Sequence, residues 1–230
     1  MTTIPGNLQH VRARIATACQ RAGRGVEEVT LLAVSKTFGA DAVRAAAAAG
    51  QRAFGENYIQ EGVEKIAALR DLGLTWHCIG PIQSNKTRLV AEHFDWVHTV
   101  DRLKIAERLS AQRPADRPPL NVCIQVNIDG GANKSGVAPG EALALARAVA
   151  ALPQLKLRGL MSIPEIAPDF EAARAVHAGA RTLFDQLNAD GLGLDTLSMG
   201  MSDDLEAAIA AGSTMVRIGT AIFGSRAPKP

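Results

Sequence analysis

Short apolar runs and helix-forming segments alternate eight times along this chain of 230 residues. The first run, Thr30–Ser35, is rich in strand-forming residues, and an alanine-rich segment, Asp41–Ala49, follows it and ends at Gly50. Continuously apolar strands that alternate with helices predict a parallel sheet covered on both faces. The later predicted strands are Arg52–Gly55, Thr75–Ile79, Trp96–Val100, Asn121–Ile128, Lys156–Ile163, Thr196–Met199 and Met215–Gly219.

Helices are predicted between these strands and before the first of them. The N-terminal segment Asn7–Gly23 has apolar residues at helical spacing and precedes all the strands. The other predicted helices are Glu56–Arg70, Gln83–His93, Arg102–Ala111, Gly140–Leu152, Phe170–Asp190 and Asp203–Ala211. Eight strand–helix units in a chain near the usual length of about 250 residues predict one α/β domain over residues 1–230, a (β/α)8 TIM barrel with an extra N-terminal helix. An open, doubly wound sheet is the alternative fold.

Composition narrows the function classes. The formal net charge is only +2 and no basic block is present, which disfavours nucleic-acid binding. Cys19, Cys78 and Cys123 lie far apart, which indicates a reducing compartment and neither a disulfide framework nor a zinc site. His93 and His98 lack a third metal ligand, so no metal is expected. The sequence has no signal-peptide pattern and no apolar run long enough for a bilayer, so we expect a cytoplasmic protein without a membrane partner.

The functional side chains of such barrels lie on the loops that follow the C-terminal ends of the strands. Lys36 stands at the end of the first predicted strand. A lysine in that place often only extends its ammonium group to water. Alternatively, it is a partly desolvated amine whose pKa is low enough for a Schiff base with a carbonyl compound. Position alone does not decide between these two interpretations.

The loops after the last two strands are suited to an anion. The loop Ser198–Ser202 leads into a helix, and Gly219 and Thr220 end the eighth strand. Hydroxyl groups and free backbone N–H groups at a helix N-terminus suit phosphate, and phosphate sites in these barrels are often built from the loops after strands seven and eight. The alternative is that Ser202 or Asp203 is a helix N-cap without a ligand.

Other polar residues carry less weight. Arg217 lies two residues before Gly219 on the same strand and is expected to point into the barrel mouth. Glu56 and Glu61 are possible acid/base partners, but carboxylates at a helix start more often interact with the helix dipole. The stretch Gly130–Ser135 ends like a phosphate-binding loop but lacks the required glycine, so a nucleotide site there is not expected.

Seven blocks of the sequence, taken in order, resemble the pyridoxal phosphate homeostasis protein family. They are Ala33–Thr37, Phe54–Tyr58, Trp76–Gly80 with Gln83–Lys86, Gln125–Asn127 with Lys134–Gly136, Gly159–Met161, Leu197–Ser202 and Val216–Gly224. The resemblance runs nearly end to end and implies a single (β/α)8 barrel like the N-terminal domain of alanine racemase. One departure is Phe38-Gly39, where many relatives have a basic residue and proline.

The resemblance also implies a cofactor and its site. Lys36 would hold pyridoxal 5′-phosphate (PLP) as an aldimine, and Arg217 would lie near the pyridine nitrogen. The remaining implied residues are Ser198, Ser202, Gly219 and Thr220 for the phosphate, and Asn57 and His77 for the ring face or its approach. A guanidinium group at that nitrogen favours the neutral pyridine, which makes the ring a weak electron sink.

Three functions follow as hypotheses. The first is a carrier without established catalysis, a monomer or weak dimer that delivers PLP to apo-enzymes, with Lys134 as a possible second amine at the mouth. The second is a PLP-dependent racemase of weak activity, which needs a second base, and Tyr58 is the only tyrosine. The third is a cofactor-free aldolase that uses Lys36 on a sugar phosphate.

Overall fold

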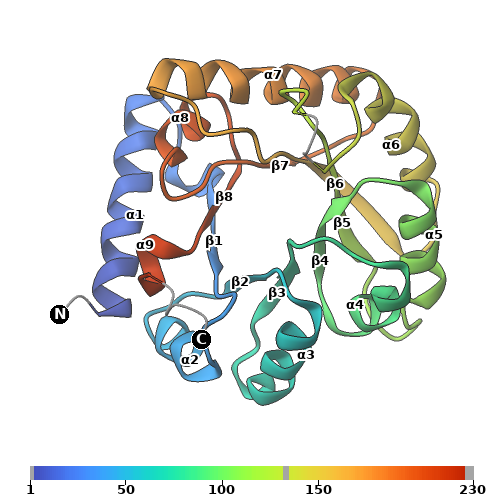
Figure 1. Ribbon diagram of the computed structural model, residues 1–230, viewed down its shortest axis with the longest axis horizontal. Coiled ribbons are helices and arrows are strands. Elements are labelled where there is room, and N and C mark those ends of the chain that lie inside the picture. The colour runs from blue at the N-terminus through green and yellow to red at the C-terminus, as the bar shows by residue number, and fades with distance from the viewer. Residues whose placement is uncertain (1–2, 132–134, 226–230) are drawn as a thin grey trace.

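Eight parallel strands close into a barrel in the computed structural model, which describes residues 3–131 and 135–225 (Figure 1). The strands are β1 (Thr30–Val34), β2 (Ala53–Glu56), β3 (Thr75–Cys78), β4 (Trp96–Val100), β5 (Leu120–Gln125), β6 (Leu155–Met161), β7 (Thr196–Ser198) and β8 (Met215–Ile218). Each strand pairs with the next one, and β8 pairs with β1 from Met215↔Thr30 to Ile218↔Ala33. This last pairing confirms the predicted (β/α)8 barrel and excludes the open sheet.

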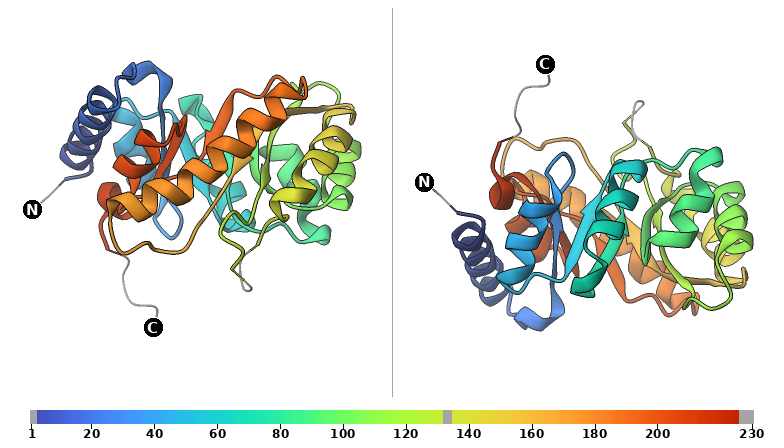
Figure 2. Two further views of the ribbon diagram at one scale, coloured as in Figure 1. Left: turned by 90° about the horizontal axis from the view of Figure 1, so that it is seen from above. Right: turned by 90° about the horizontal axis from the view of Figure 1, so that it is seen from below.

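Helices surround the strands (Figures 1 and 2). They are α1 (Ile4–Arg21), α2 (Ala40–Ala48), α3 (Ile59–Ala68), α4 (Thr87–His93), α5 (Leu103–Gln112), α6 (Ala142–Ala150), α7 (Phe170–Ala189), α8 (Leu205–Ala210) and α9 (Thr220–Phe223). From α2 onward, each helix follows one strand. Among the described residues, none of these helices has both the length and the apolar character to span a bilayer.

The extra N-terminal helix occupies a place in the outer ring. The helix after β8, α9, is only four residues long, so it leaves part of the seam between β8 and β1 uncovered. Helix α1 packs there against α8 and α9, with Leu8, Val11 and Ile15 buried. The Asn7 amide donates to the Ile222 carbonyl of α9 at 2.8 Å.

Several element boundaries differ from the prediction. The segment Glu56–Arg70 was predicted as one helix, but β2 includes Glu56 and α3 begins at Ile59. The helix predicted from Gln83 begins as a 3-10 turn, Ser84–Lys86. The Glu56 error has a physical reason: its carboxylate is fully buried in an ion pair, and an apolar pattern cannot reveal a buried charged residue at a strand end.

Alternate residues of a strand face two different cores. Ala33 of β1 packs in the large cluster between the strands and the helices. Its neighbours Leu32 and Val34 belong to a small separate cluster with Ile79 and Met215. The period of two along a strand accounts for this separation, because successive side chains point to opposite faces of the sheet.

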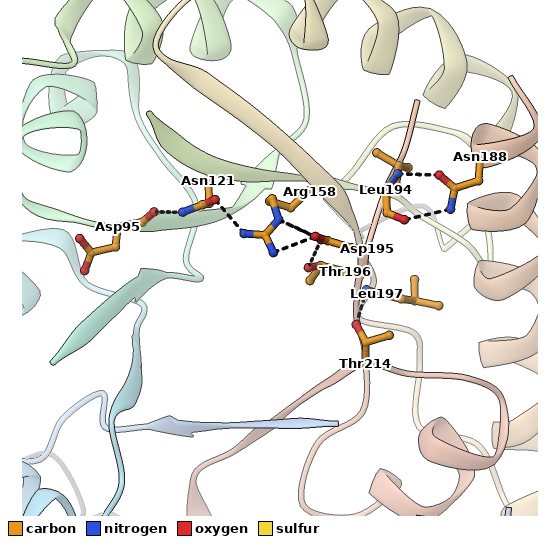
Figure 3. Close-up of polar contacts among 9 residues, drawn as sticks. All are labelled: Asp95, Asn121, Arg158, Asn188, Leu194, Asp195, Thr196, Leu197 and Thr214. Carbon is orange, nitrogen blue, oxygen red and sulfur yellow. Dashed lines mark hydrogen bonds and ion pairs between the residues drawn. The ribbon is translucent and has the colours of Figure 1, made fainter. Parts of the chain in front are cut away.

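A polar network joins residues near the N-terminal ends of the strands (Figure 3). The loops predicted to carry the site follow the other ends of the strands. Arg158 of β6 donates to Asp195 at 2.8 Å and to the Asn121 side chain at 2.9 Å. Asn121 donates to the Asp95 carbonyl at 3.2 Å, which reaches the start of β4. In TIM barrels, contacts at this end typically stabilise the fold, whereas the other end carries the functional residues.

Gly159 of β6 allows β6 and β7 to approach closely. A Cβ at this position would overlap the Thr196 carbonyl oxygen. We therefore expect Gly159→Ala to lower the free energy of unfolding by about 3 kcal/mol or more, as overpacking against backbone does. Urea denaturation measures this. The matched control is Gly140→Ala, where a Cβ meets no atom within 4 Å, and equal stability of the two variants would contradict the expectation.

Candidate functional site

A cavity of about 210 Å³ opens at the C-terminal ends of the strands. Residues from the loops after β1, β2, β3, β6, β7 and β8 surround it, as the barrel topology requires. Its lining residues are Val34, Lys36, Phe38, Asn57, Ile79, Ile163, Met201, Ser202, Asp203, Arg217, Gly219, Thr220 and Gly224. The cavity therefore combines an amine, a guanidinium group, two hydroxyl groups and an apolar wall.

The structure brings together most of the residues singled out in the sequence. Those that line the cavity are Lys36, Asn57, Ser202, Arg217, Gly219 and Thr220. His77 and Ser198 do not line it, because both are buried inside the barrel on β3 and β7. Lys134 lies outside the described residues. Tyr58 is 49% exposed and is not part of the cavity lining.

Lys36 and the loop after β8 meet because β1 and β8 are neighbours. Lys36 follows β1, and Gly219 and Thr220 follow β8. A Cβ on Gly219 would stand 3.2 Å from the Val34 carbonyl oxygen, so a larger residue would crowd β1 there. Phe38, where the chain departs from many relatives of the resembled family, stacks on Phe223 of α9 at 5.2 Å between ring centroids. The aromatic pair joins the two loops across this seam.

Two side chains, Asp204 before α8 and Arg14 of α1, hold the loop after β7 in place. Asp204 accepts a hydrogen bond from the Met201 N–H at 2.6 Å and contacts Nε2 of the buried His177 at 2.9 Å. Arg14 of α1 donates to the Ser202 carbonyl at 3.0 Å. Asp204 is the N-cap of α8. The alternative interpretation of Ser202 or Asp203 as the N-cap is therefore wrong, because the N-cap is the next residue.

A chain of polar side chains crosses the barrel interior below the cavity. Arg217 Nη1 donates to Ser198 Oγ at 2.8 Å, and its Nη2 donates to the Ser162 carbonyl at 2.9 Å. Ser198 Oγ lies 2.9 Å from Nδ1 of His98, and Nε2 of His98 lies 2.9 Å from Nδ1 of His77. Side chains from β8, β7, β4 and β3 thus fix the place of the Arg217 guanidinium group.

One assignment of protons satisfies this chain with both rings neutral. Ser198 accepts from Arg217 and donates its own proton to His98, which then donates from Nε2 to His77. Burial lowers the pKa of His77 to about 3. Burial, together with the neighbouring His77 and Arg217, lowers the pKa of His98 well below its ordinary value. Burial also lowers the pKa of Arg217 to about 10, so the guanidinium group stays charged at neutral pH.

The sequence patterns place His98 on a strand and give no metal site there, but they did not reveal its role. Alternation along β4 was the signal that could have found it, because His98 lies two residues after Trp96, which pairs with His77 across the sheet. The described residues contain no group of three metal-ligating side chains. His77 stacks on the Trp96 ring at 5.1 Å between centroids, and His98 lies at the edge of the same cluster.

Unpaired polar atoms mark the cavity as a place for a polar ligand. Asn57 Oδ1 and Ser162 Oγ are buried and have no hydrogen-bond partner within residues 3–131 and 135–225. Asn57 lines the cavity, and Ser162 precedes the lining residue Ile163. Buried polar atoms in proteins nearly always have a partner. A ligand with polar groups in the cavity fits the unpaired Asn57 oxygen.

Comparison with known proteins identifies the family. The family model for the N-terminal domain of alanine racemase matches residues 6–227. The pyridoxal phosphate homeostasis protein of Pseudomonas aeruginosa is 64% identical over 226 residues, which are 98% of this chain and 97% of that protein. The protein of the same name from Escherichia coli K12 is 58% identical over 236 residues, with 98% of each chain covered.

The chain belongs to the pyridoxal phosphate homeostasis protein family.

A solved structure of a similar protein has the same fold. The structure of PipY from Synechococcus elongatus without PLP has a TM-score of 0.85 and 40% identity, and covers 96% of this chain and 100% of that one. The PipY structure with PLP bound has a TM-score of 0.80 and 40% identity, and covers 91% of this chain and 100% of that one. The single-barrel fold that the resemblance implied is therefore confirmed.

The buried histidines make the stability of this family member depend on pH. Their folded-state pKa values lie below the ordinary value of about 6.5, so the unfolded chain binds more protons and stability falls as pH falls from 6.5 toward 3. At pH 5 each such histidine lowers the free energy of unfolding by about 2 kcal/mol relative to pH 7.

Urea denaturation between pH 6.5 and 5 measures this effect. We expect His77→Gln to reduce the slope of stability against pH by about one proton, because glutamine does not titrate. Gln9→Ala, a change at an exposed position on α1, is the control and should leave the slope unchanged. A His77→Gln slope equal to that of the wild type would show that His77 is not buried in the neutral form.

Proposed function

We propose that this chain binds PLP in the mouth cavity and holds it reversibly as an imine on Lys36, so that the protein stores and delivers the cofactor. One observation carries the proposal: a lysine amine and the loops after β7 and β8 line the same cavity of about 210 Å³. The PLP-bound structure of PipY and the names of the related proteins support it.

In this proposal the loops of the last two strands receive the phosphate. The hydroxyl groups of Ser202 and Thr220 and the backbone beside Gly219 border the cavity. Hydroxyl and backbone N–H donors make strong, charge-assisted hydrogen bonds to a phosphate dianion. The loop that contains Ser202 is held by Arg14 and Asp204, so these donors need little rearrangement when the anion binds.

Lys36 supplies the covalent link. Its unprotonated ε-amine attacks the aldehyde carbon of PLP, a C=N bond replaces the C=O bond, and the oxygen leaves as water. The same step in reverse, or exchange with the amine of another molecule, returns the free aldehyde. Reversibility is what a carrier that delivers PLP to apo-enzymes requires.

Arg217 would face the ring nitrogen of the bound cofactor. The guanidinium group has five N–H groups, and the contacts to Ser198 and Ser162 use two of them. A permanently charged donor at this nitrogen disfavours its protonation, so the ring withdraws electrons weakly. This electronic state suits storage better than carbanion chemistry and supports a carrier over an enzyme.

Racemisation needs a proton donor or acceptor on each face of the ring. Tyr58, the residue that would have to be the second base by analogy with racemases, is exposed outside the cavity lining. We therefore propose the carrier function and test racemisation beside it. Assays of the PLP-loaded protein with L- and D-amino acids distinguish the two functions. Turnover that requires Lys36 would contradict the carrier function and support a racemase.

Borohydride reduction tests the link to Lys36. We expect purified protein mixed with PLP to gain the visible absorbance of an imine, and the reduced adduct to map to the peptide that contains Lys36. Lys36→Ala should lose that adduct, and its affinity for PLP should fall at least about tenfold, a change of about 1.4 kcal/mol. Lys156→Ala, at an exposed position on β6, is the control. A colourless protein whose Lys36 instead traps a sugar phosphate would support the aldolase.

The phosphate contacts are tested by comparing PLP with pyridoxal, which lacks the phosphate. The double variant Ser202→Ala, Thr220→Val should weaken PLP binding about 100-fold or more, because each hydrogen bond to a charged group contributes about 1.5 kcal/mol or more. Pyridoxal binding should change little. Titration by absorbance measures both, with Thr182→Val on the exposed face of α7 as the control. Equal weakening for both ligands would place the phosphate elsewhere.

A further inference from the structure

The turn that carries Lys36 contains a strained residue. The Phe38 N–H donates to the Ser35 carbonyl at 3.1 Å, which closes a four-residue turn with Lys36 and Thr37 at its centre. Thr37 has φ = 70°, in the left-handed region that glycine adopts easily and a β-branched residue rarely adopts. A residue held in such a conformation persists because its surroundings fix it, and strain of this kind is common at functional sites.

A buried ammonium group lies under this turn. Lys65 of α3 is 5% exposed. Its Nζ donates to the Ser35 carbonyl at 2.7 Å, to Glu56 Oε1 at 2.8 Å and to Glu61 Oε1 at 2.6 Å. These contacts use the three N–H groups of an ammonium ion. Glu56 Oε1 also accepts from the Ser35 hydroxyl at 2.5 Å, so the residue before Lys36 is held through both its backbone and its side chain.

Glu61 holds the other side of the turn. Its Oε1 accepts from the Thr37 backbone N–H at 2.6 Å while it pairs with Lys65. The ion-paired group Glu56–Lys65–Glu61 thus contacts the residues immediately before and immediately after Lys36. Helix spacing makes this possible, because Glu61 and Lys65 are four residues apart on α3 and share one face.

We propose that Glu61 and Lys65 are positioning residues that fix the backbone turn on both sides of Lys36, so that its amine meets the aldehyde of a bound pyridoxal ligand. This inference rests on the proposed function. The Glu61–Lys65 pair is not among the described residues that line the mouth cavity; it borders a neighbouring cavity together with Thr37 and Phe38. Its effect therefore falls on the covalent step and not on recognition of the phosphate.

Two ligands separate these steps. Pyridoxine 5′-phosphate carries the same phosphate and ring but an alcohol in place of the aldehyde, so it reports noncovalent binding alone. In Glu61→Ala, which removes the acceptor for the Thr37 N–H, we expect the rate of imine formation with PLP at saturating ligand to fall about tenfold. The affinity for pyridoxine 5′-phosphate should stay within about twofold of the wild type.

Three further variants complete the experiment. Glu61→Gln keeps an oxygen that accepts from the Thr37 N–H and should restore most of the rate. Adding Thr37→Gly to Glu61→Ala removes the backbone strain and should raise the rate of imine formation at least threefold above that of Glu61→Ala. This double variant also provides a folded protein if Glu61→Ala is unstable. Glu64→Ala removes an exposed carboxylate of the same helix and should behave as the wild type.

The outcomes are distinct. If the wild type forms no imine at Lys36, the proposed function fails and the inference fails with it. If the wild type does form the imine and Glu61→Ala forms it at the same rate, only the inference is overturned. Equal losses for PLP and for pyridoxine 5′-phosphate would also overturn it, because they would indicate general damage to the cavity.

Discussion

The pairing of β8 with β1 is the contact on which the site depends. It closes the sheet, and it sets the loop that carries Lys36 beside the loop of Gly219 and Thr220, although more than 180 residues separate them. Helix α1 packs on the outside of this seam, where a longer helix after β8 would otherwise lie. The Phe38–Phe223 stack closes the same seam at the mouth.

The barrel interior below the cavity is polar where an apolar core would be more stable. A buried arginine requires partners, and the Ser198–His98–His77 chain and the Ser162 carbonyl supply them. Because the histidines must be neutral for this arrangement, the chain leaves Arg217 as the sole charge along it. The interior thus presents a fixed positive group to the cavity floor, with the carboxylate of Asp203 also in the cavity lining.

The alternation of apolar runs sufficed to predict the barrel, because eight parallel strands with helices between them have few ways to cover both faces. It also placed Lys36, Arg217 and Gly219 at one end, since all strand C-termini of a barrel share a face. It did not reveal Glu56 or His98. Both are polar residues inside strands, and their partners lie on other elements: Lys65 on α3 pairs with Glu56, and Ser198 on β7 contacts His98. Such pairings depend on register and strand length, which apolar patterns do not specify.

The amine and the loops proposed to hold the phosphate have separate supports. The turn of Lys36 is held by α3 through Lys65 and Glu61, whereas the loop after β7 is held by α1 and by Asp204. Under the proposed function, a bound cofactor spans the seam between these two supports. Breaking the imine then leaves the phosphate contacts intact, so release occurs in two steps of which only the first is chemical. Under the same proposal, an incoming amine would take over the aldehyde while the phosphate is still held, so the cofactor would be exchanged without first being lost to water.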